Sequence, residues 1–312
     1  MSDFFLLALF QLFWASSYTA MKLALGEMPL GLVLIFRYGM AALVLWPLAL
    51  RSGGGWRFSI RDAAIIVLVG VLDFALSPFL QLRAVQLTFT SDVAVLVAFE
   101  PMLTALLAVM VLRERLARPT LVAFAVATLG MLLMSDLAFT TDGLSGGLRL
   151  YGNVLFLLSL CCEALYSVSS RFLSQQHSPY RLSCLMMSAG AVANLLAHHD
   201  ALTHAQVAAI GPTGWGMVLF LALGCSALGY AGWCVLLRRM PVNQITLSLF
   251  LQPIFGGLVS YVVLREVPSV RTFSGAALIF ATLLAWLLWH LRSRRNERIY
   301  ATETARRAKS GC

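Results

Sequence analysis

Charged residues are scarce in this chain of 312 residues: they make up 12% of it, whereas hydrophobic residues make up 60%. Soluble domains usually carry about 25% charged residues. A chain this apolar could not cover a water-facing surface, and its mean hydropathy of +0.83 agrees with that. The composition therefore excludes a soluble globular domain and predicts an integral membrane protein.

Several chemical signatures are also missing. The sequence has no G-x-x-x-x-G-K-[ST] segment that would indicate direct coupling to ATP, no nucleophile elbow and no H-E-x-x-H pair. The six cysteines form no C-x-x-C pair, so we interpret them as small buried hydrophobes. His198, His199, Asp200 and His204 could bind zinc, but such a cluster at a membrane boundary is more often solvated. We therefore predict no metal and no cofactor.

Apolar runs dominate what remains. A run of about 18–24 such residues can cross about 30 Å of hydrocarbon as a helix. The ten runs are 3–24, 29–50, 63–84, 91–112, 119–136, 149–171, 179–199, 213–237, 242–264 and 271–291. The N-terminal run lacks a basic segment and a cleavage site, so we interpret it as a retained helix, not as a signal peptide.

The basic residues indicate the orientation. The net charge of +9 would favour nucleic acid in a soluble protein, but here the basic residues cluster between and after apolar runs. If the N-terminus is cytoplasmic, 17 of the 23 Lys and Arg fall in cytoplasmic segments and five at external ends. This split predicts a cytoplasmic-membrane protein with both termini inside, the lipid bilayer as its surroundings and no nucleic-acid partner.

An internal repeat divides the chain. Residues 100–114 read EPMLTALLAVMVLRE and residues 252–266 read QPIFGGLVSYVVLRE; a proline, a leucine and the block VLRE coincide at an offset of 152. Each copy holds five helices, and because five is odd the second copy enters the membrane from the opposite side. Inverted repeats of this kind are the usual architecture of secondary transporters.

The predicted fold class is an all-α integral membrane protein with ten transmembrane helices in two inverted five-helix repeats. The predicted parts are a first repeat at 1–137, an external linker at 138–148, a second repeat at 149–291 and a basic cytoplasmic tail at 292–312, which we expect to be disordered or to lie on the membrane surface. The fused repeat could form a complete pathway in one chain, so we predict a monomer.

Four segments carry a resemblance to a known family. FWASSYTAMK near the start, IFRYGMAALVL in the second run, FEPMLTALLAVMVLRERL in the fourth and FLQPIFGGLVSYVVLREVPS in the ninth resemble EamA-type members of the drug/metabolite transporter superfamily. The resemblance covers about 3–291 and implies a ten-helix bundle with a central cavity. It also implies transport, often export, of amino acids or related small metabolites. One departure is that Gln252 stands where the first copy has Glu100.

Ionisable residues inside membrane helices are costly, so Arg37, Asp73, Glu100 and Glu163 are site candidates by default. Arg37 and Glu100 both lie roughly 12 Å from the external side, so they could pair if their helices are neighbours. Glu100 thus has three alternatives: a structural ion pair with Arg37, a gating or proton-linked group, or a direct substrate contact.

Other polar and aromatic residues share helix faces with these groups. The predicted substrate-binding or cavity residues are Gln11, Trp14, Tyr18, Asp73, Ser77, Gln81, Glu100, Thr104, Glu163, Tyr166, Tyr230, Trp233, Ser248 and Gln252. Carboxylates beside aromatic faces suit an amine-type or amphipathic substrate, although each aromatic could simply pack or form an interface belt. Pro78, Pro101 and Pro253 are predicted helix kinks.

The sequence therefore predicts a secondary active transporter that exports or exchanges a small organic metabolite. The alternatives are an intramembrane enzyme acting on a lipid or isoprenoid, which the inverted repeat argues against, and a passive channel. The VLRE blocks are interpreted as structural, with Glu114 and Glu266 pairing with a neighbouring arginine or capping the next helix.

Overall fold

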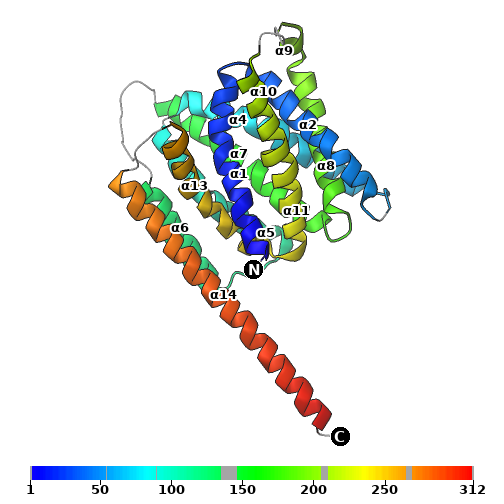
Figure 1. Ribbon diagram of the computed structural model, residues 1–312, viewed down its shortest axis with the longest axis vertical. Helices are drawn as coiled ribbons and strands as arrows, with labels where there is room; N and C mark the ends of the chain where they lie inside the picture. The colour runs from blue at the N-terminus through cyan, green and yellow to red at the C-terminus, as the bar shows by residue number, and fades with distance from the viewer. Residues whose placement is uncertain are drawn as a thin grey trace.

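The computed structural model describes residues 2–53, 55–88, 90–134, 146–204, 210–264 and 269–310. Its helices lie side by side in one bundle (Figure 1). The chain begins at one end of the bundle, and α14 leaves the bundle at that same end. Within the first half the segments are α1 (Ser2–Leu25), α2 (Leu30–Arg51), α3 (Ile60–Val71), the π-helix η1 (Leu72–Leu76), α4 (Ser77–Leu87), α5 (Thr90–Leu112) and α6 (Arg118–Met134).

The second half has more breaks in its helices. Its segments are α7 (Gly146–Leu173), α8 (Pro179–Ala197), α9 (His199–His204), α10 (Pro212–Phe220), the π-helix η3 (Leu221–Leu228), α11 (Gly229–Arg239), α12 (Val242–Ile245), the 3-10 helix η4 (Thr246–Leu251), α13 (Gln252–Val259), the π-helix η5 (Ser260–Leu264) and α14 (Val270–Ser310). Apart from α9, these segments cover the predicted apolar runs. The linker residues 138–145 and Glu266 lie outside the described residues.

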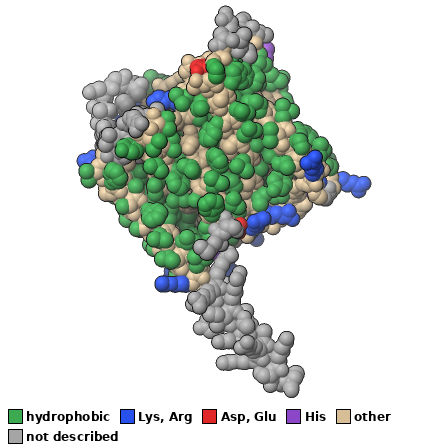
Figure 2. All heavy atoms as spheres, viewed as in Figure 1, with side chains coloured by type: hydrophobic (Ala, Val, Ile, Leu, Met, Phe, Trp, Pro, Cys, Tyr) green, Lys and Arg blue, Asp and Glu red, His purple; other side chains and the backbone are tan. Residues whose placement is uncertain are grey.

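Eight helical spans are long and apolar enough to cross a membrane, counted over the described residues. Leu96–Leu112 and Arg118–Met134 are shorter apolar helices. Hydrophobic side chains cover most of the visible face in Figure 2, and Lys and Arg lie mainly near its margins. Leu43 and Leu196 are 70% and 71% exposed, as expected for side chains that contact lipid. The protein is therefore a multi-pass membrane protein; the ten-crossing count and the inverted repeat remain predictions.

Of the two alternatives for the tail, disorder is wrong as far as Ser310, because α14 (Val270–Ser310) continues as one helix. A position on the membrane surface stays a prediction. The helix α14 packs against α6 where two glycines face each other. A Cβ on Gly275 would lie 2.5 Å from the carbonyl oxygen of Gly130. Small residues allow membrane helices to approach this closely.

The two halves interleave. The helix α2 packs along α8, α4 and α5 pack along α7, and α1 packs against α13 and α10. Two glycines hold η1 close to α8. A Cβ on Gly70 would lie 2.3 Å from the Met186 carbonyl oxygen, and one on Gly190 would lie 2.4 Å from the Phe74 Cβ. This contact positions Asp73, which is the second residue of η1.

Candidate functional site

Glu163 of α7 is the best-coordinated carboxylate of the site. Gln81 donates its side-chain amide to Glu163 Oε1 at 2.6 Å, and Ser77 donates its hydroxyl to the same oxygen at 3.2 Å. Ser77 also lies 3.3 Å from the Ser159 carbonyl oxygen. The residues predicted on two separate helix faces are therefore brought together where α4 packs on α7. Donors to a carboxylate favour its ionised form.

Asp73 contrasts with Glu163. Its side chain is 3% exposed, and neither carboxylate oxygen accepts a hydrogen bond from any residue that the structure describes. It is close enough to Glu163, Arg37 and Glu100 to interact with them electrostatically. A buried polar group without a partner is rare and calls for an explanation.

Arg37 does not form the ion pair with Glu100 that the sequence allowed. Its Nε donates to the Ser226 hydroxyl at 2.9 Å, and its guanidinium lies over the Tyr38 ring at 5.0 Å from the ring centroid. Both partners of the expected pair are described, and no ion pair joins them in this part of the chain. The physical reason is packing: α2 contacts α8 and η3, whereas α5 contacts α7 and α6. Ser226 was not predicted as a site residue.

Glu100 of α5 is half-buried and interacts electrostatically with Glu163 and Asp73. Tyr18 of α1 is 64% exposed yet interacts electrostatically with Glu100, Glu163 and Arg37. Thr104, in contrast, is buried and hydrogen-bonds the Glu100 carbonyl oxygen at 3.1 Å on its own helix.

Polar side chains of α1 join those of the ninth apolar run. Gln11 donates to the Ser248 hydroxyl at 2.8 Å, and Gln252 donates to the Gln11 side-chain oxygen at 2.9 Å. Gln11 and Ser248 are buried, and Gln252 is partly buried. Three predicted residues from opposite ends of the sequence thus form one chain of hydrogen bonds between the halves.

Aromatic side chains form a cluster beside these polar groups. Trp14 lies 5.4 Å from Tyr230 and 5.1 Å from Trp233 between ring centroids, and Tyr166 lies 5.1 Å from Tyr230. Trp14 donates to the Cys225 carbonyl oxygen at 3.0 Å, and Trp233 donates to the Ser167 hydroxyl at 3.2 Å. Their polar atoms are thus satisfied internally, as buried Trp side chains require.

The sequence did not predict Phe74 as part of this cluster. Phe74 lies 4.9 Å from Tyr230, 5.5 Å from Tyr166 and 5.2 Å from Tyr38. Phe74 directly follows Asp73 in the sequence, and this adjacency was the available signal. Helical periodicity did not use it, because neighbouring residues of an α-helix point to different faces. The π-helical turn of η1 changes which residues share a face, and no feature of the sequence predicted that turn.

The predicted prolines occupy different contexts. Pro78 is the second residue of α4, directly after η1, and Pro253 is the second residue of α13, directly after the 3-10 helix η4. Pro101 lies inside α5, which is helical without interruption from Thr90 to Leu112. A bend at each proline stays a prediction.

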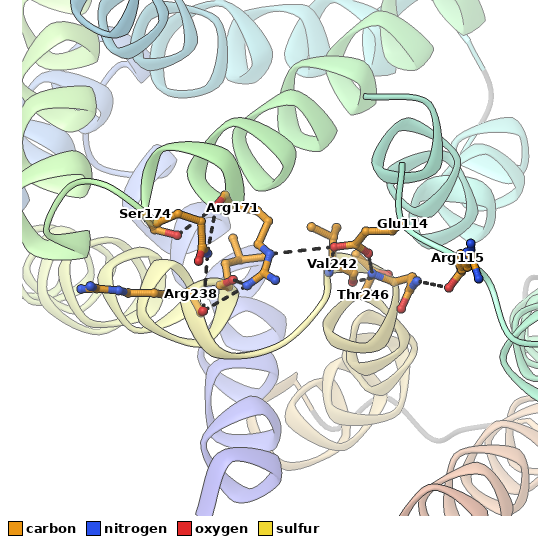
Figure 3. A network of polar contacts seen from close by, with 10 residues as sticks. Glu114, Arg115, Arg171, Ser174, Arg238, Val242 and Thr246 are labelled. Carbon is orange, nitrogen blue, oxygen red and sulfur yellow. Dashed lines mark hydrogen bonds and ion pairs between the residues drawn. The ribbon is translucent and has the colours of Figure 1, made fainter. Parts of the chain in front are cut away.

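A polar network closes the bundle between the halves at the end of α5 (Figure 3). Glu114 accepts the backbone N–H groups of Val242 and Asn243 at 2.9 and 3.2 Å. Arg171 Nε lies 3.9 Å from Glu114, and Arg171 also donates to the Leu237 carbonyl oxygen at 2.6 Å. Glu114 therefore does cap a helix, but the helix belongs to the other half of the chain.

Comparison with known proteins identifies the family. The EamA-like transporter family model matches residues 1–136 and 150–288. The chain belongs to the EamA-like transporter family. As an EamA protein it is similar to the uncharacterized transporter YyaM of Bacillus subtilis (strain 168), with 23% identity over 88% of this chain and 90% of that protein. It is also similar to a probable terminal-alkyne amino-acid exporter of Streptantibioticus cattleyicolor, with 27% identity over 87% of this chain and 88% of that protein.

A solved structure supports the fold of this EamA protein. The chain resembles a crystal structure with a TM-score of 0.78 and 18% identity, over 93% of this chain and 99% of that chain. At this identity the likeness shows the fold alone.

Proposed function

We propose that this EamA protein is a secondary active transporter that exports or exchanges a small metabolite carrying an amino group, such as an amino acid or an amine. Two inverted repeats would alternate access across the cytoplasmic membrane, with both termini inside. The proposed substrate class rests on one observation: Asp73, Glu100, Glu163 and one arginine, Arg37, lie close enough to interact electrostatically.

This charge pattern matches an amino-acid zwitterion. A carboxylate such as Glu163 can bind the ammonium group. The Arg37 guanidinium, whose Nε donates to Ser226, can bind the carboxylate with its other N–H groups, which have no hydrogen-bond partner among the described residues. The aromatic cluster around Tyr230 supplies an apolar wall and faces that attract an ammonium group. The similarity to a probable terminal-alkyne amino-acid exporter supports the same class.

Contacts between the halves support alternating access. The interior side chains at Gln11 and Glu163 each bond a partner from the other half, namely Ser248 and Gln81. A movement of one half against the other would therefore break or remake bonds at the site. This is how a site between repeats opens to alternate sides.

The binding test is a thermal-shift screen of the purified protein with matched ligands. We expect stabilisation by amino acids or amines, and none by sugars or nucleosides. If amino acids stabilise it, their N-acetyl forms should fail because the ammonium is lost, and their methyl esters should bind more weakly because Arg37 loses its partner. Glu163→Gln should lose the response, and Asp200→Asn, at a 79% exposed side chain, should keep it. Stabilisation by a neutral sugar alone would contradict the proposed class.

The transport test uses proteoliposomes loaded with the ligand that the screen finds. If the protein exchanges substrates, unlabelled ligand on the opposite side of the membrane should accelerate the flux of the labelled ligand. A passive channel, the runner-up, would show flux without such acceleration and without saturation. Release of a chemically altered ligand would favour the intramembrane enzyme instead.

A further inference from the structure

Asp73 is a buried carboxyl group without a hydrogen-bond partner. It is 3% exposed, and both side-chain oxygens are unpaired among the residues that the structure describes. It lies in η1, a π-helical turn, and such turns frequently mark functional sites. An ionised carboxylate in this position would lack the donors that normally offset its desolvation.

Three neighbouring side chains, those of Asn194, Ser77 and Tyr166, direct their donors elsewhere. Both hydrogens of the Asn194 side-chain amide go to carbonyl oxygens, those of Phe74 at 2.8 Å and Gly190 at 2.9 Å. The Ser77 hydroxyl is directed to Ser159 and Glu163, and the Tyr166 hydroxyl to the Tyr230 carbonyl oxygen at 3.2 Å. These bonds leave the Asp73 carboxyl without a hydrogen-bond donor among the residues that the structure describes.

The charges around Asp73 also disfavour its ionised form. Glu163 and Glu100 would repel a carboxylate there, and Arg37 is one positive charge for three acids. Titratable side chains from other elements also interact with Asp73, and those within the described chain are Tyr38 of α2, Cys162 and Tyr166 of α7 and Tyr230 of α11. The titratable side chains on α3, α4 and α8, which pack on η1, are Arg61, Asp62, Arg83, Tyr180, Arg181 and Cys184.

We propose that Asp73 is a proton-binding site, which holds its carboxyl as the neutral acid in this conformation while Glu163 stays ionised and faces the substrate. A proton needs one oxygen, whereas a metal cation needs several oxygen ligands. No group of three or more His, Cys, Asp or Glu side chains in the described chain could hold a metal. When opening admits water to η1, the acid gives its proton to water and leaves a carboxylate, so proton release is tied to the conformational change.

Infrared spectroscopy of the full-length protein in detergent tests whether the Asp73 carboxyl is protonated, and it needs no substrate. A protonated carboxyl gives a C=O band that is separate from carboxylate bands and shifts in D₂O. At neutral pH we expect such a band in the wild type and in Glu163→Gln, and its loss in Asp73→Asn. Asn has the shape of the neutral acid, so this variant should fold. A band that survives Asp73→Asn, or no band in the wild type, would overturn the proposal.

A second measurement needs no variant. Carbon-13 labelling of aspartate carboxyls should shift the band, whereas labelling of glutamate carboxyls should not. A shift with labelled glutamate would assign the proton to Glu100 or Glu163 and overturn the assignment to Asp73. The inference goes beyond the proposed function, because a transporter driven by substrate exchange alone would still pass the binding and exchange tests while failing this one.

Discussion

Glu114 at the end of the first half accepts the backbone N–H of Val242 at the start of α12 in the second half, at 2.9 Å. The residue before it, Arg113, has a φ of 55°, the left-handed conformation that ends a helix and turns the chain. Such a conformation costs about 1–2 kcal/mol for a residue other than glycine. The caps at Val242 and Asn243 offset this cost, so α5 and α12 stabilise each other.

Removal of the Glu114 carboxylate should destabilise this end of the bundle. Glu114→Ala leaves the first N–H groups of α12 without an acceptor, and a lost cap costs about 0.5–2 kcal/mol. Glu114→Gln keeps one acceptor oxygen and should cost less. The melting temperature in detergent measures both. As a control, Asp3→Ala breaks an exposed 3.2 Å pair with Arg239 and should change it little. Equal effects of all three changes would contradict the capping role.

Arg37 and Glu100 should contribute to stability independently. Because Arg37 bonds Ser226 and its helix does not pack along α5, the losses in Arg37→Met and Glu100→Gln should add within about 0.5 kcal/mol in the double variant. A dry ion pair would behave differently, since removal of both partners restores much of what removal of one loses. A double-mutant cycle of unfolding free energies distinguishes the two. Rescue in the double variant would restore the ion-pair hypothesis.

The periodicity of polar residues predicted much of the candidate site. Gln11, Ser248 and Gln252 were placed on interior faces, and the structure joins them by hydrogen bonds. Ser77 and Gln81 were predicted four residues apart on one face, and both bond Glu163. Intramembrane polar residues carry this information because a side chain of this kind is costly against lipid and therefore faces the interior of the bundle.

The sequence could not predict which helices pack against each other. Equal depth made Arg37 and Glu100 plausible partners, but depth does not say which helices are neighbours. Phe74 and Ser226 lie inside the π-helical turns η1 and η3, where the facing of residues departs from α-helical periodicity, which explains why both were missed. The VLRE block predicted that Glu114 pairs with a neighbouring arginine or caps the next helix, yet only the packed halves show that the capped helix is α12.

The close contact of α3 with α8 should depend on Gly70. Gly70→Ala would place a Cβ 2.3 Å from the Met186 carbonyl oxygen, so the helices must separate and the melting temperature should fall by several degrees. Gly39→Ala is the matched control, because a Cβ there meets nothing within 4 Å. This change should be neutral or stabilise by about 0.5–1 kcal/mol, since alanine favours a helix over glycine. Equal losses in both variants would show that Gly70 has no special packing role.

Gln81 should determine whether the charge on Glu163 is tolerated. Gln81→Met removes the 2.6 Å donor and leaves Ser77 as the remaining side-chain donor within the described chain, so the variant should lose about 1–3 kcal/mol. Gln175→Met, at an exposed glutamine, is the control and should lose far less.

The sign of a second substitution provides the sharper test. In the wild type, Glu163→Gln replaces a well-coordinated carboxylate and should be neutral or destabilising. In the Gln81→Met background it removes a charge that has lost its main donor, so it should raise the melting temperature. Both expected outcomes require that Glu163 is ionised in the folded protein. Equal effects of Glu163→Gln in both backgrounds would mean that it carries a proton, and the division of roles between Glu163 and Asp73 would then fail.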